Sequence, residues 1–383
     1  MSLNDCYNFN DFRRLAKKKL PASIFHYIDG GSDDEVTLKR NTESFLKCDL
    51  VPNILASVGE PDLSTNVFGK KIDMPIFLSP VAMQRLFHHD GDKASVRAAE
   101  KFGTFYSMST MATSSIEEIA NTASGPKMFQ IYIHKTQGLT DNLIDRCKSS
   151  GFNAMCLTVD TIVAGNRERD HKWGFTTPPK LNLKSLVSFA THPMWTINYL
   201  THEKFQLPNV SNFVKKSSSI AKGVMEYINE QYDPAMSWKD AEYCIKRWGG
   251  PFALKGVMSV EDAKRAVDIG ATAIMLSNHG GRQLDGSRAP FDQLERIVDA
   301  VGGKIEIIVD GGIRRGTHVL KALSLGATAC SFGKGFLFAL SAGGQKGVEM
   351  ILQRMREELR RDMILLGKKN IADLNKDNIA FRD

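Results

Sequence analysis

The stretch Thr272–Gly286, TAIMLSNHGGRQLDG, is the part of the chain from which the rest is best interpreted. Its first half, Thr272–Ser277, is a short apolar run without Gly or Pro, as expected of a fully buried strand. An imidazole and a guanidinium follow at once, because only two glycines separate His279 from Arg282. A group that titrates near neutral pH beside a fixed cation suits an enzyme that takes a proton from a substrate held by its carboxylate. An ordinary loop with a core His and a surface Arg is the alternative.

Short apolar, β-branched or aromatic runs recur from Pro75 onward, with stretches of helical spacing between most of them. Strand and helix in alternation indicate a parallel sheet of the α/β class, and eight units predict a (β/α)8 TIM barrel over about residues 75–340. A doubly wound open sheet is the alternative, which the lack of a GxGxxG motif after the first strand disfavours. The expected strands are Ile76–Ser79, Thr104–Ser109, Met128–Ile133, Ala154–Val159, Phe252–Lys255, Thr272–Ser277, Ile305–Asp310 and Ala329–Gly333. The expected helices are Lys93–Phe102, Ser115–Thr122, Leu139–Ser149, Val260–Ile269, Phe291–Val301 and Thr317–Leu325.

Helices are expected before the barrel, and the whole chain, residues 1–383, is expected to form one domain. The first two are predicted at Asp11–Leu20 and Ile24–Ile28, because Pro21 and the glycines after Ile28 end them. A third is predicted to begin at an N-cap at Ser32, with acidic residues in its first turn, and to run to about Phe45.

A long insertion is predicted after the fourth strand, at about residues 171–237, ahead of a helix at Trp238–Trp248. Additions that follow the C-terminal end of a barrel strand usually cover the active site. The insertion combines apolar residues at helical spacing with lysines, which fits a helix that lies on an anionic membrane; a lid that packs within an oligomer is the alternative. The residues concerned are Leu183, Leu186, Val187, Ala190, Trp195, Ile197, Tyr199, Leu200, Lys184, Lys204, Lys215, Lys216 and Lys222.

Composition narrows the classes of partner. Apolar and charged residues make up 42% and 24% of the chain, as in globular proteins, and the net charge is +7. The basic residues are spread out, which disfavours nucleic acid as a partner and leaves anionic ligands or an anionic membrane surface. Six scattered cysteines without a CxxC pair predict no metal site and a reducing compartment. The start does not resemble a signal peptide and no apolar run reaches about 18 residues, so a cytoplasmic location is expected.

Polar or charged residues stand at the ends of most of the expected strands. Because the C-terminal ends of barrel strands meet at one face, these residues are expected to converge into one site. They are Ser109, Gln130, Tyr132, Thr158, Asp160, Lys255, His279, Arg282, Asp310, Arg314, Gly333 and Lys334.

Two glycine-rich loops point to a phosphate. Residues 310–314, DGGIR, follow the seventh strand, and residues 331–335, SFGKG, follow the eighth, each with a cation. Barrels commonly bind phosphate at these two loops through backbone N–H groups and a helix N-terminus. The implied ligand is a phosphorylated cofactor or substrate.

These residues resemble the FMN-dependent α-hydroxy-acid oxidases and dehydrogenases, which include glycolate oxidase and the bacterial respiratory L-lactate dehydrogenases. SNHGGRQLDG at 277–286 is close to the family's signature, while DPAMSWKD at 233–240 and GGPFALKG at 249–256 add a likeness to the L-lactate dehydrogenases. The resemblance runs from about residue 9 to residue 374. It departs at Lys334, where the family commonly has Arg, and at Met111, where glycolate oxidase has Trp.

The resemblance implies a role for each site residue. His279 is implied to be the base that takes a proton from the substrate, and Asp160 to stabilise the imidazolium that results. The implied substrate ligands are Tyr27, Arg167 and Arg282 for the carboxylate and Tyr132 for the oxygen on C2. The implied FMN ligands are the backbone of Pro80–Ala82 with Ser109, Gln130 and Thr158 at the isoalloxazine ring, Lys255 at its N1–C2=O edge, Asp310, Gly312, Arg314, Gly333 and Lys334 at the ribityl chain and phosphate, and Ser277.

The implied reaction is the FMN-dependent oxidation of an L-2-hydroxy acid, with L-lactate to pyruvate as the first expectation and a cytochrome or quinone as the electron acceptor. One alternative is an oxidase of the glycolate oxidase type, which uses oxygen. Another is a non-redox barrel that binds a phosphorylated ligand. Related enzymes are often tetramers, so a homo-oligomer is expected. Peripheral contact with the inner face of the membrane would bring the enzyme to its acceptor.

Overall fold

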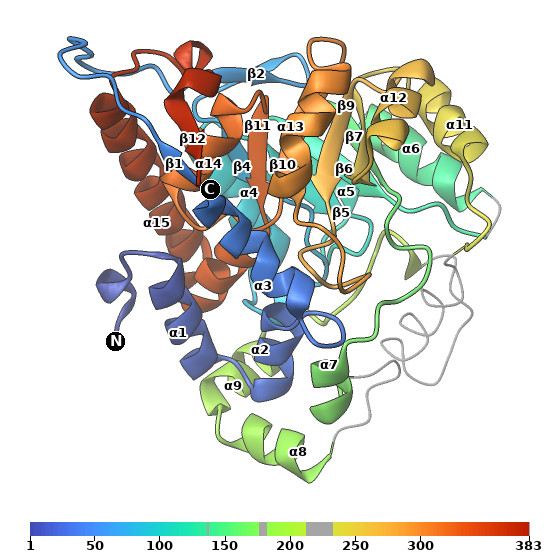
Figure 1. Ribbon diagram of the computed structural model, residues 1–383. Helices are drawn as coiled ribbons and strands as arrows, with labels where there is room; N and C mark the ends of the chain where they lie inside the picture. The colour runs from blue at the N-terminus through green and yellow to red at the C-terminus, as the bar shows by residue number, and fades with distance from the viewer. Residues whose placement is uncertain (136–137, 176–181, 212–232, 383) are drawn as a thin grey trace.

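The computed structural model describes residues 1–135, 138–175, 182–211 and 233–382. Eight parallel strands close into a barrel in chain order (Figure 1), with the last pairing back onto the first. Each lies within two residues of its expected bounds, so the predicted (β/α)8 barrel is confirmed. The strands are β4 (Ile76–Leu78), β5 (Tyr106–Ser109), β6 (Lys127–Ile131), β7 (Ala154–Thr158), β8 (Phe252–Val257), β9 (Ala273–Ser277), β10 (Glu306–Asp310) and β11 (Ala329–Phe332).

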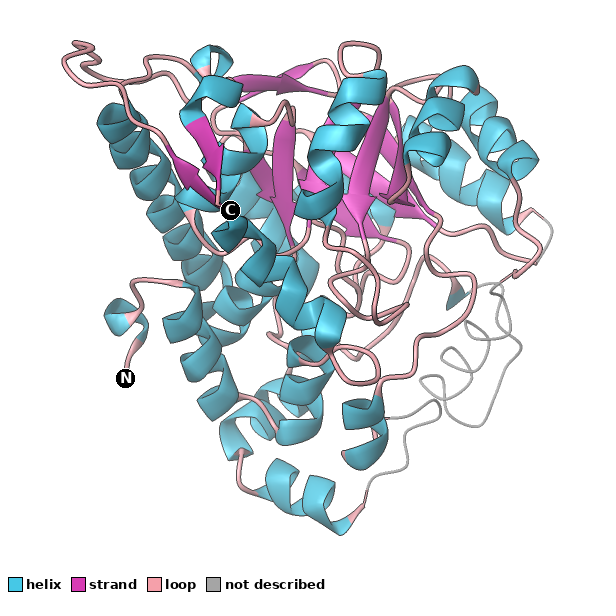
Figure 2. Ribbon diagram, in the orientation of Figure 1, coloured by secondary structure: helices cyan, strands magenta, loops and turns pink. Residues whose placement is uncertain are grey.

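Helices surround the barrel on the outside (Figure 2). One of them starts with a capping box: Ser115 accepts a hydrogen bond from the Glu118 N–H at 3.1 Å, and the Glu118 carboxylate accepts one from the Ser115 N–H at 2.7 Å. The helices predicted around the barrel are present within two residues of their expected bounds. They are α4 (Gly91–Lys101), α5 (Ile116–Thr122), α6 (Leu139–Ser149), α11 (Trp238–Trp248), α12 (Val260–Asp268), α13 (Pro290–Val301) and α14 (Gly316–Ser324). Helix α15 (Lys334–Leu366) follows the last barrel strand and is interrupted at Gly343 and Gly344.

Side chains fill the barrel, and a hairpin closes its N-terminal end. The hairpin consists of β2 (Thr65–Val67) and β3 (Lys70–Ile72). Phe68 at its turn packs against Phe105 at a centroid distance of 5.6 Å, and its N–H donates to the Glu306 carboxylate at 2.9 Å. The C-terminal end of the barrel is therefore the end at which a site can form.

The N-terminal segment runs along the barrel and then across its C-terminal end (Figure 1). Helix α1 (Phe9–Lys19) packs on α15, and α2 (Ala22–Asp29) and α3 (Val36–Glu43) follow. Strand β1 (Cys48–Leu50) pairs antiparallel with β12 (Ile379–Phe381) near the C-terminus. Short 3-10 helices complete the described elements at Leu3–Asp5, Ser44–Lys47, Gln84–Leu86, Ile371–Asp373 and Lys376–Asn378.

The expected N-cap of the third helix is wrong. Helix α3 begins at Val36, and Ser32 gives it no cap. The carboxylate of Asp285 instead accepts hydrogen bonds from the N–H groups of Val36 at 3.2 Å and Thr37 at 2.7 Å. The cap therefore comes from the loop after β9, about 250 residues away, and a search for local capping patterns could not find it.

The described part of the insertion contains three short helices at the open end of the barrel, in the lower part of Figure 1. They are α7 (Glu168–Lys172), α8 (Leu183–Ala190) and α9 (Pro193–Thr201). The predicted insertion after the fourth barrel strand is confirmed. Lys215, Lys216 and Lys222, expected on its basic face, lie outside the described residues.

Specific contacts hold the insertion to its neighbours. The Ala22 N–H at the start of α2 donates to Ser188 Oγ on α8 at 2.8 Å. Trp195 on α9 donates from Nε1 to the Leu86 carbonyl at 2.8 Å and stacks on Tyr199 at a centroid distance of 5.1 Å. Trp195 therefore packs against residues of the insertion and of the segment after β4. Among the described residues, no helix is both long and apolar enough to cross a membrane.

Candidate active site

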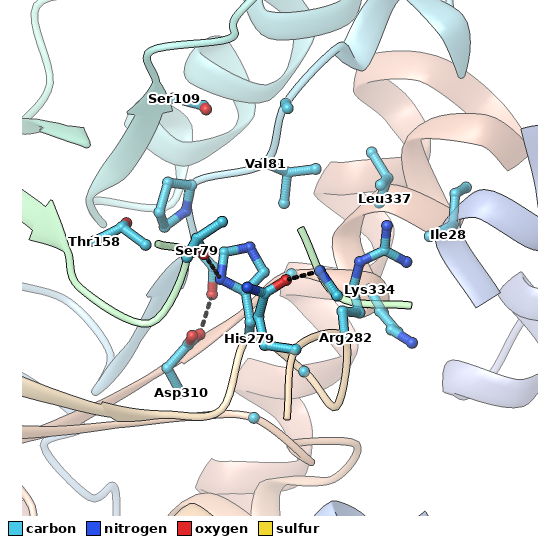
Figure 3. A pocket seen from close by; sticks show the side chains of 18 of the residues that line it. Ile28, Ser79, Val81, Ser109, Thr158, His279, Arg282, Asp310, Lys334 and Leu337 are labelled. Carbon is cyan, nitrogen blue, oxygen red and sulfur yellow. Dashed lines mark hydrogen bonds between the residues drawn. The ribbon is translucent and has the colours of Figure 1, made fainter. Parts of the chain in front are cut away.

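A cavity of about 380 Å³ lies at the C-terminal end of the barrel, within the size range of ligand pockets. Asp160 and Ser277 do not line it, but each contacts a residue that does. Figure 3 shows side chains from several strand ends and the loops after them pointing into the cavity. Of the expected site residues, those that line it are Tyr27, Pro80, Ala82, Ser109, Gln130, Tyr132, Thr158, Arg167, Lys255, His279, Arg282, Asp310, Gly312, Arg314, Gly333 and Lys334.

His279 is held by a carboxylate and a hydroxyl. It follows β9 in the left-handed backbone region, with φ of 57°, which is uncommon for a residue with a Cβ. Its Nδ1 lies 2.9 Å from Asp160 Oδ1 and 3.1 Å from Thr161 Oγ. Burial would raise the pKa of Asp160, but the facing His279 and then Lys255 lower it below its usual range. Because Nδ1 is engaged, Nε2 is the ring nitrogen left for proton exchange in the cavity.

A buried ion pair lies at the closed end of the cavity. Lys255 Nζ is 3.0 Å from Asp310 Oδ2 and donates to Ser277 Oγ at 3.0 Å. Ser277 Oγ also donates to Asp310 Oδ2 at 2.8 Å. Ser79 Oγ donates to Asp310 Oδ1 at 2.7 Å, as drawn in Figure 3. Against the effect of burial, Lys255 lowers the pKa of Asp310 to about 2, and Asp310 raises the pKa of Lys255. The cavity therefore contains a permanently charged ammonium.

Polar side chains at the ends of β5, β6 and β7 form a second wall. Ser109 Oγ donates to Gln130 Oε1 at 3.1 Å, and Thr158 is buried beside them. The Gln130 Nε2 group is buried and has no hydrogen-bond partner among the described residues. A buried amide without a partner is costly, so this group is suited to a bound acceptor.

Two guanidinium groups face one carboxylate at the mouth of the cavity. Arg282 lies over the Tyr27 ring at 4.7 Å and Arg167 at 6.0 Å. Asp170 lies near both; burial raises its pKa, and Arg282 and then Arg167 oppose the rise. Two cations with one anion leave a net positive charge, which favours an anionic ligand.

The two glycine loops carry cations without a matching anion. Gly312 has φ of 77°, and a Cβ there would lie 1.8 Å from the Asn41 carbonyl oxygen, so only glycine fits. Burial lowers the pKa of Arg314 to about 10. Burial and then the guanidiniums of Arg282 and Arg314 lower the pKa of Lys334 well below its usual range. Neither Arg314 nor Lys334 forms an ion pair with a described carboxylate group, so an anion there would stabilise both.

Several supporting residues were not predicted. Thr161 Oγ1 donates to Asp160, Ser79 Oγ donates to Asp310, and Asp170 lies near Arg282 and Arg167. Gln283 Nε2 donates to the carbonyls of Asp160 at 2.9 Å and Val163 at 2.8 Å, which ties the loop after β7 to the loop after β9. The position of Gln283 beside Arg282 was the only signal in the sequence.

Asn41 and Asn278 form another unpredicted pair. Their amides exchange two hydrogen bonds, of 2.8 and 2.7 Å, in a buried position. The pair joins α3 to the loop that carries His279. The position of Asn278 directly before His279 was a signal, whereas nothing in the sequence pointed to Asn41.

Fold and site together describe a TIM barrel with a His–Asp pair at its C-terminal end and, at the last two strand ends, glycine loops and cations suited to a phosphorylated group. A family model for the FMN-dependent dehydrogenases matches residues 16–381, and the chain belongs to that family. The predicted family and its cofactor, FMN, are confirmed.

Several similar proteins are named as enzymes that act on 2-hydroxy acids. Glycolate oxidase 1 of Oryza sativa subsp. indica is 40% identical over 377 residues, covering 98% of this chain and 96% of its own. L-lactate dehydrogenase of Vibrio parahaemolyticus is 40% identical over 371 residues, covering 97% of each chain. The crystal structure of the monotopic membrane protein (S)-mandelate dehydrogenase is 31% identical, with a TM-score of 0.94, and covers 99% of this chain and 100% of its own.

The residues present fit FMN. The unpartnered Gln130 amide matches the hydrogen-bonding edge of a flavin ring, and the glycine loops with Arg314 and Lys334 match a phosphate. Lys255 adds a positive charge to the same cavity, which His279 also lines. FMN would be held by these residues.

Proposed function

We propose that this protein oxidises an L-2-hydroxy acid to the 2-oxo acid, with L-lactate to pyruvate as the preferred reaction. The observation that carries the proposal is that His279, paired with Asp160, lines the same cavity as Arg282. A base and a carboxylate-binding cation in one cavity suit a substrate with a carboxylate next to the carbon that reacts. The names of the relatives support the same substrate class.

The catalytic residues divide the work of the oxidation. Arg282, with Arg167 and Tyr27, holds the substrate carboxylate, and Tyr132 hydrogen-bonds the oxygen on C2. His279 accepts one proton through Nε2, and Asp160 stabilises the imidazolium. The bound FMN would supply the acceptor for the two electrons and the second proton that the oxidation releases.

The remaining residues bind and tune the cofactor. Lys255, kept charged by Asp310 and hydrogen-bonded to Ser277, favours negative charge on the reduced ring. The proposed FMN ligands at the ring are the backbone of Pro80–Ala82 and the side chains of Ser109, Gln130 and Thr158. Those at the ribityl chain and phosphate are Asp310, Gly312, Arg314, Gly333 and Lys334.

The substrate side chain would contact an apolar part of the cavity. Met111 lines it and is held by hydrogen bonds from its N–H to Ser109 Oγ at 3.2 Å and from the Met83 N–H to its carbonyl at 3.0 Å. Its flexible thioether leaves room for a methyl group such as that of lactate, where glycolate has only hydrogen.

The test is anaerobic reduction of the bound flavin by a panel of 2-hydroxy acids. We expect L-lactate to bleach the flavin faster than glycolate, (S)-mandelate or D-lactate. If no 2-hydroxy acid bleaches it, the proposal is wrong and the non-redox alternative is favoured. Oxygen is then readmitted: slow reoxidation supports a cytochrome or quinone as acceptor, and fast reoxidation with peroxide formation indicates an oxidase.

We also propose that the insertion contacts a membrane, since a respiratory acceptor is reached there. Six large apolar side chains on α8 and α9 are more than half exposed, and they are Leu183, Leu186, Val187, Met194, Ile197 and Leu200. Exposed apolar side chains on short helices suit burial at a lipid interface. A relative of closely similar fold is described as a monotopic membrane protein. Burial of the same face in a homo-oligomer, such as a tetramer, is the alternative.

We further propose that residues 1–383 act as a single functional unit located in the cytoplasm, at the inner face of the membrane. Residues from α2, the barrel loops and the start of the insertion all line the cavity, and they include Tyr27, His279 and Phe175. No part of the site could then be separated as a domain of its own.

A further inference from the structure

The last turn of α2 connects the two ends of the cavity. Arg282 Nη1 donates to the carbonyl oxygens of Tyr27 and Gly30, the latter at 3.2 Å. Lys334 Nζ donates to the carbonyl oxygens of Asp29 at 3.1 Å and Gly30 at 2.9 Å. The Gly30 carbonyl therefore accepts from a cation at the substrate end and from a cation at the phosphate end.

The cations lie there because a helix C-terminus attracts them. The last carbonyls of a helix have no intrahelical partner, and they form the negative end of the helix dipole. The Gly30 N–H closes α2 by donating to His26 O at 2.8 Å, which leaves the Gly30 carbonyl oxygen outside the helix.

This turn of α2 is fixed from other sides as well. The Asp29 carboxylate accepts from Arg13 Nη2 at 2.8 Å and from Arg169 Nη1 at 3.0 Å. The Ser32 N–H donates to the Gly281 carbonyl oxygen at 2.9 Å, next to Arg282 in the chain. A firmly held carbonyl can set the position of whatever cation it accepts from.

We propose that Lys334 is a positioning residue for Arg282 and acts through the Gly30 carbonyl, beyond its contact with the FMN phosphate. The proposal rests on the proposed function, in which Arg282 binds the substrate carboxylate. Loss of the Lys334 ammonium removes one of the two cations that donate to the Gly30 carbonyl, so this acceptor of Arg282 is held less firmly. Lys334 thus couples the binding of phosphate to the binding of carboxylate.

The charge state of Lys334 determines whether a bound phosphate strengthens or weakens the support of Arg282. Without an anion nearby, burial and the guanidiniums of Arg282 and Arg314 disfavour the ammonium form. A phosphate favours this form, and an ammonium has three protons to donate, two of them to the carbonyls of α2. Occupation of the phosphate end therefore strengthens the support of Arg282.

Oxalate is a suitable probe because it is a dicarboxylate without a C–H bond, so it can bind at the carboxylate site without being oxidised. Its dissociation constant is measured by perturbation of the flavin absorption spectrum at saturating FMN, and the dissociation constant of FMN is measured separately by flavin fluorescence. The variants are Lys334→Gln and Lys334→Met, made in parallel in case one does not fold, and Lys334→Arg. The matched control is Arg314→Gln, a cation of the same end whose hydrogen bond among the described residues is to Ile313 O, at 2.8 Å, and not to a carbonyl of α2.

We expect Lys334→Gln and Lys334→Met to loosen both FMN and oxalate, with oxalate weakened about tenfold, the effect of one charged hydrogen bond. Lys334→Arg keeps both affinities, and Arg314→Gln loosens FMN but leaves oxalate unchanged. The inference is overturned if Lys334 and Arg314 variants change oxalate binding equally.

Arg282→Lys separates this inference from the proposed function. If oxalate binds to Arg282→Lys as to the wild type, Arg282 does not hold the carboxylate, and the proposed function fails at that point. If Arg282→Lys weakens oxalate but Lys334→Gln does not, only the positioning role is excluded.

Discussion

The imidazole of His279 is the group on which the proposed chemistry depends most. We expect His279→Gln to retain FMN, because the residue contacts Asp160 and Thr161 and not the phosphate end. Flavin reduction by L-lactate should fall about 10²–10⁴-fold, the usual contribution of a general base. Stopped-flow absorbance under anaerobic conditions measures it. Reduction within threefold of the wild type would show that His279 is not the base.

The carboxylate of Asp310 compensates a buried charge. We expect Asp310→Asn to destabilise the protein by about 3–5 kcal/mol, because the buried Lys255 ammonium loses its partner. Urea unfolding of the FMN-loaded protein gives the free energy. Asp292→Asn is the control, since its partner Lys47 is 58% exposed and a surface pair contributes less than about 1 kcal/mol. Equal effects of the two substitutions would contradict the expectation.

The same carboxylate should shape the stability of the protein in acid. Its pKa is lowered from 3.8 to about 2 in the folded state, so the unfolded state takes up protons first as the pH falls. The stabilisation is therefore present above about pH 4 and is lost as the pH falls through about 2. Asp310→Asn should show a flatter loss of unfolding free energy between pH 4 and pH 2 than the wild type.

Residue-level prediction succeeded where position along a strand decides the outcome. His279, Lys255 and Asp310 were expected at one site because barrel strands end on one face. The hydroxyl of Ser277, which links Lys255 to Asp310, was expected only through the family resemblance. Asp170 was not expected at all, because its place beside Arg282 depends on how the insertion folds back.

At the scale of elements, α3 depends on the loop after β9 for its first turn. We expect Asp285→Ala to lower the unfolding free energy by about 1–2 kcal/mol, because two N–H groups at the start of α3 lose their acceptor. Asp34→Ala is the control: the sequence placed Asp34 in the first turn, but α3 starts beyond it, and a change of less than about 0.5 kcal/mol is expected. Chemical denaturation measures both free energies of unfolding. A larger effect at Asp34 than at Asp285 would contradict the assigned cap and favour a local cap near Ser32.

Whole elements were predictable where the pattern is local. The helices Leu139–Ser149 and Trp238–Trp248 have the predicted bounds, because apolar spacing and end signals lie within them. The cap on α3 and the carbonyls that α2 offers to Arg282 and Lys334 arise from contacts between distant segments. Such contacts appear only once the chain is folded.

At the scale of the whole molecule, the charge and the apolar surface both favour contact with an anionic membrane. The chain has a net charge of +7. The exposed apolar residues of α8 and α9 lie at the same end of the barrel as the cavity (Figure 1). Docking through this face would direct the cavity toward the membrane, where the proposed acceptor, a quinone or cytochrome, would be reached.

The triple variant Leu183→Gln, Leu186→Gln and Ile197→Gln tests this docking. Each side chain is more than half exposed, so the fold should tolerate the changes. We expect the wild type to co-sediment with vesicles that contain anionic phospholipid. The variant should bind about a hundredfold or more weakly, because about 1.5 kcal/mol of burial is lost per side chain. FMN content and flavin reduction by L-lactate should not change.

The control for this experiment replaces Ile54 and Leu55 with Gln. They are 82% and 95% exposed, in a loop joined to the end of α15 by the bond from the Asn53 N–H to Leu366 O, away from the insertion. Vesicle binding by this control should equal that of the wild type, because its substitutions lie outside the proposed face. If the wild type fails to bind vesicles even at low salt, the face does not dock on a membrane. If the triple variant instead lowers the mass measured by light scattering, the face is a contact between subunits.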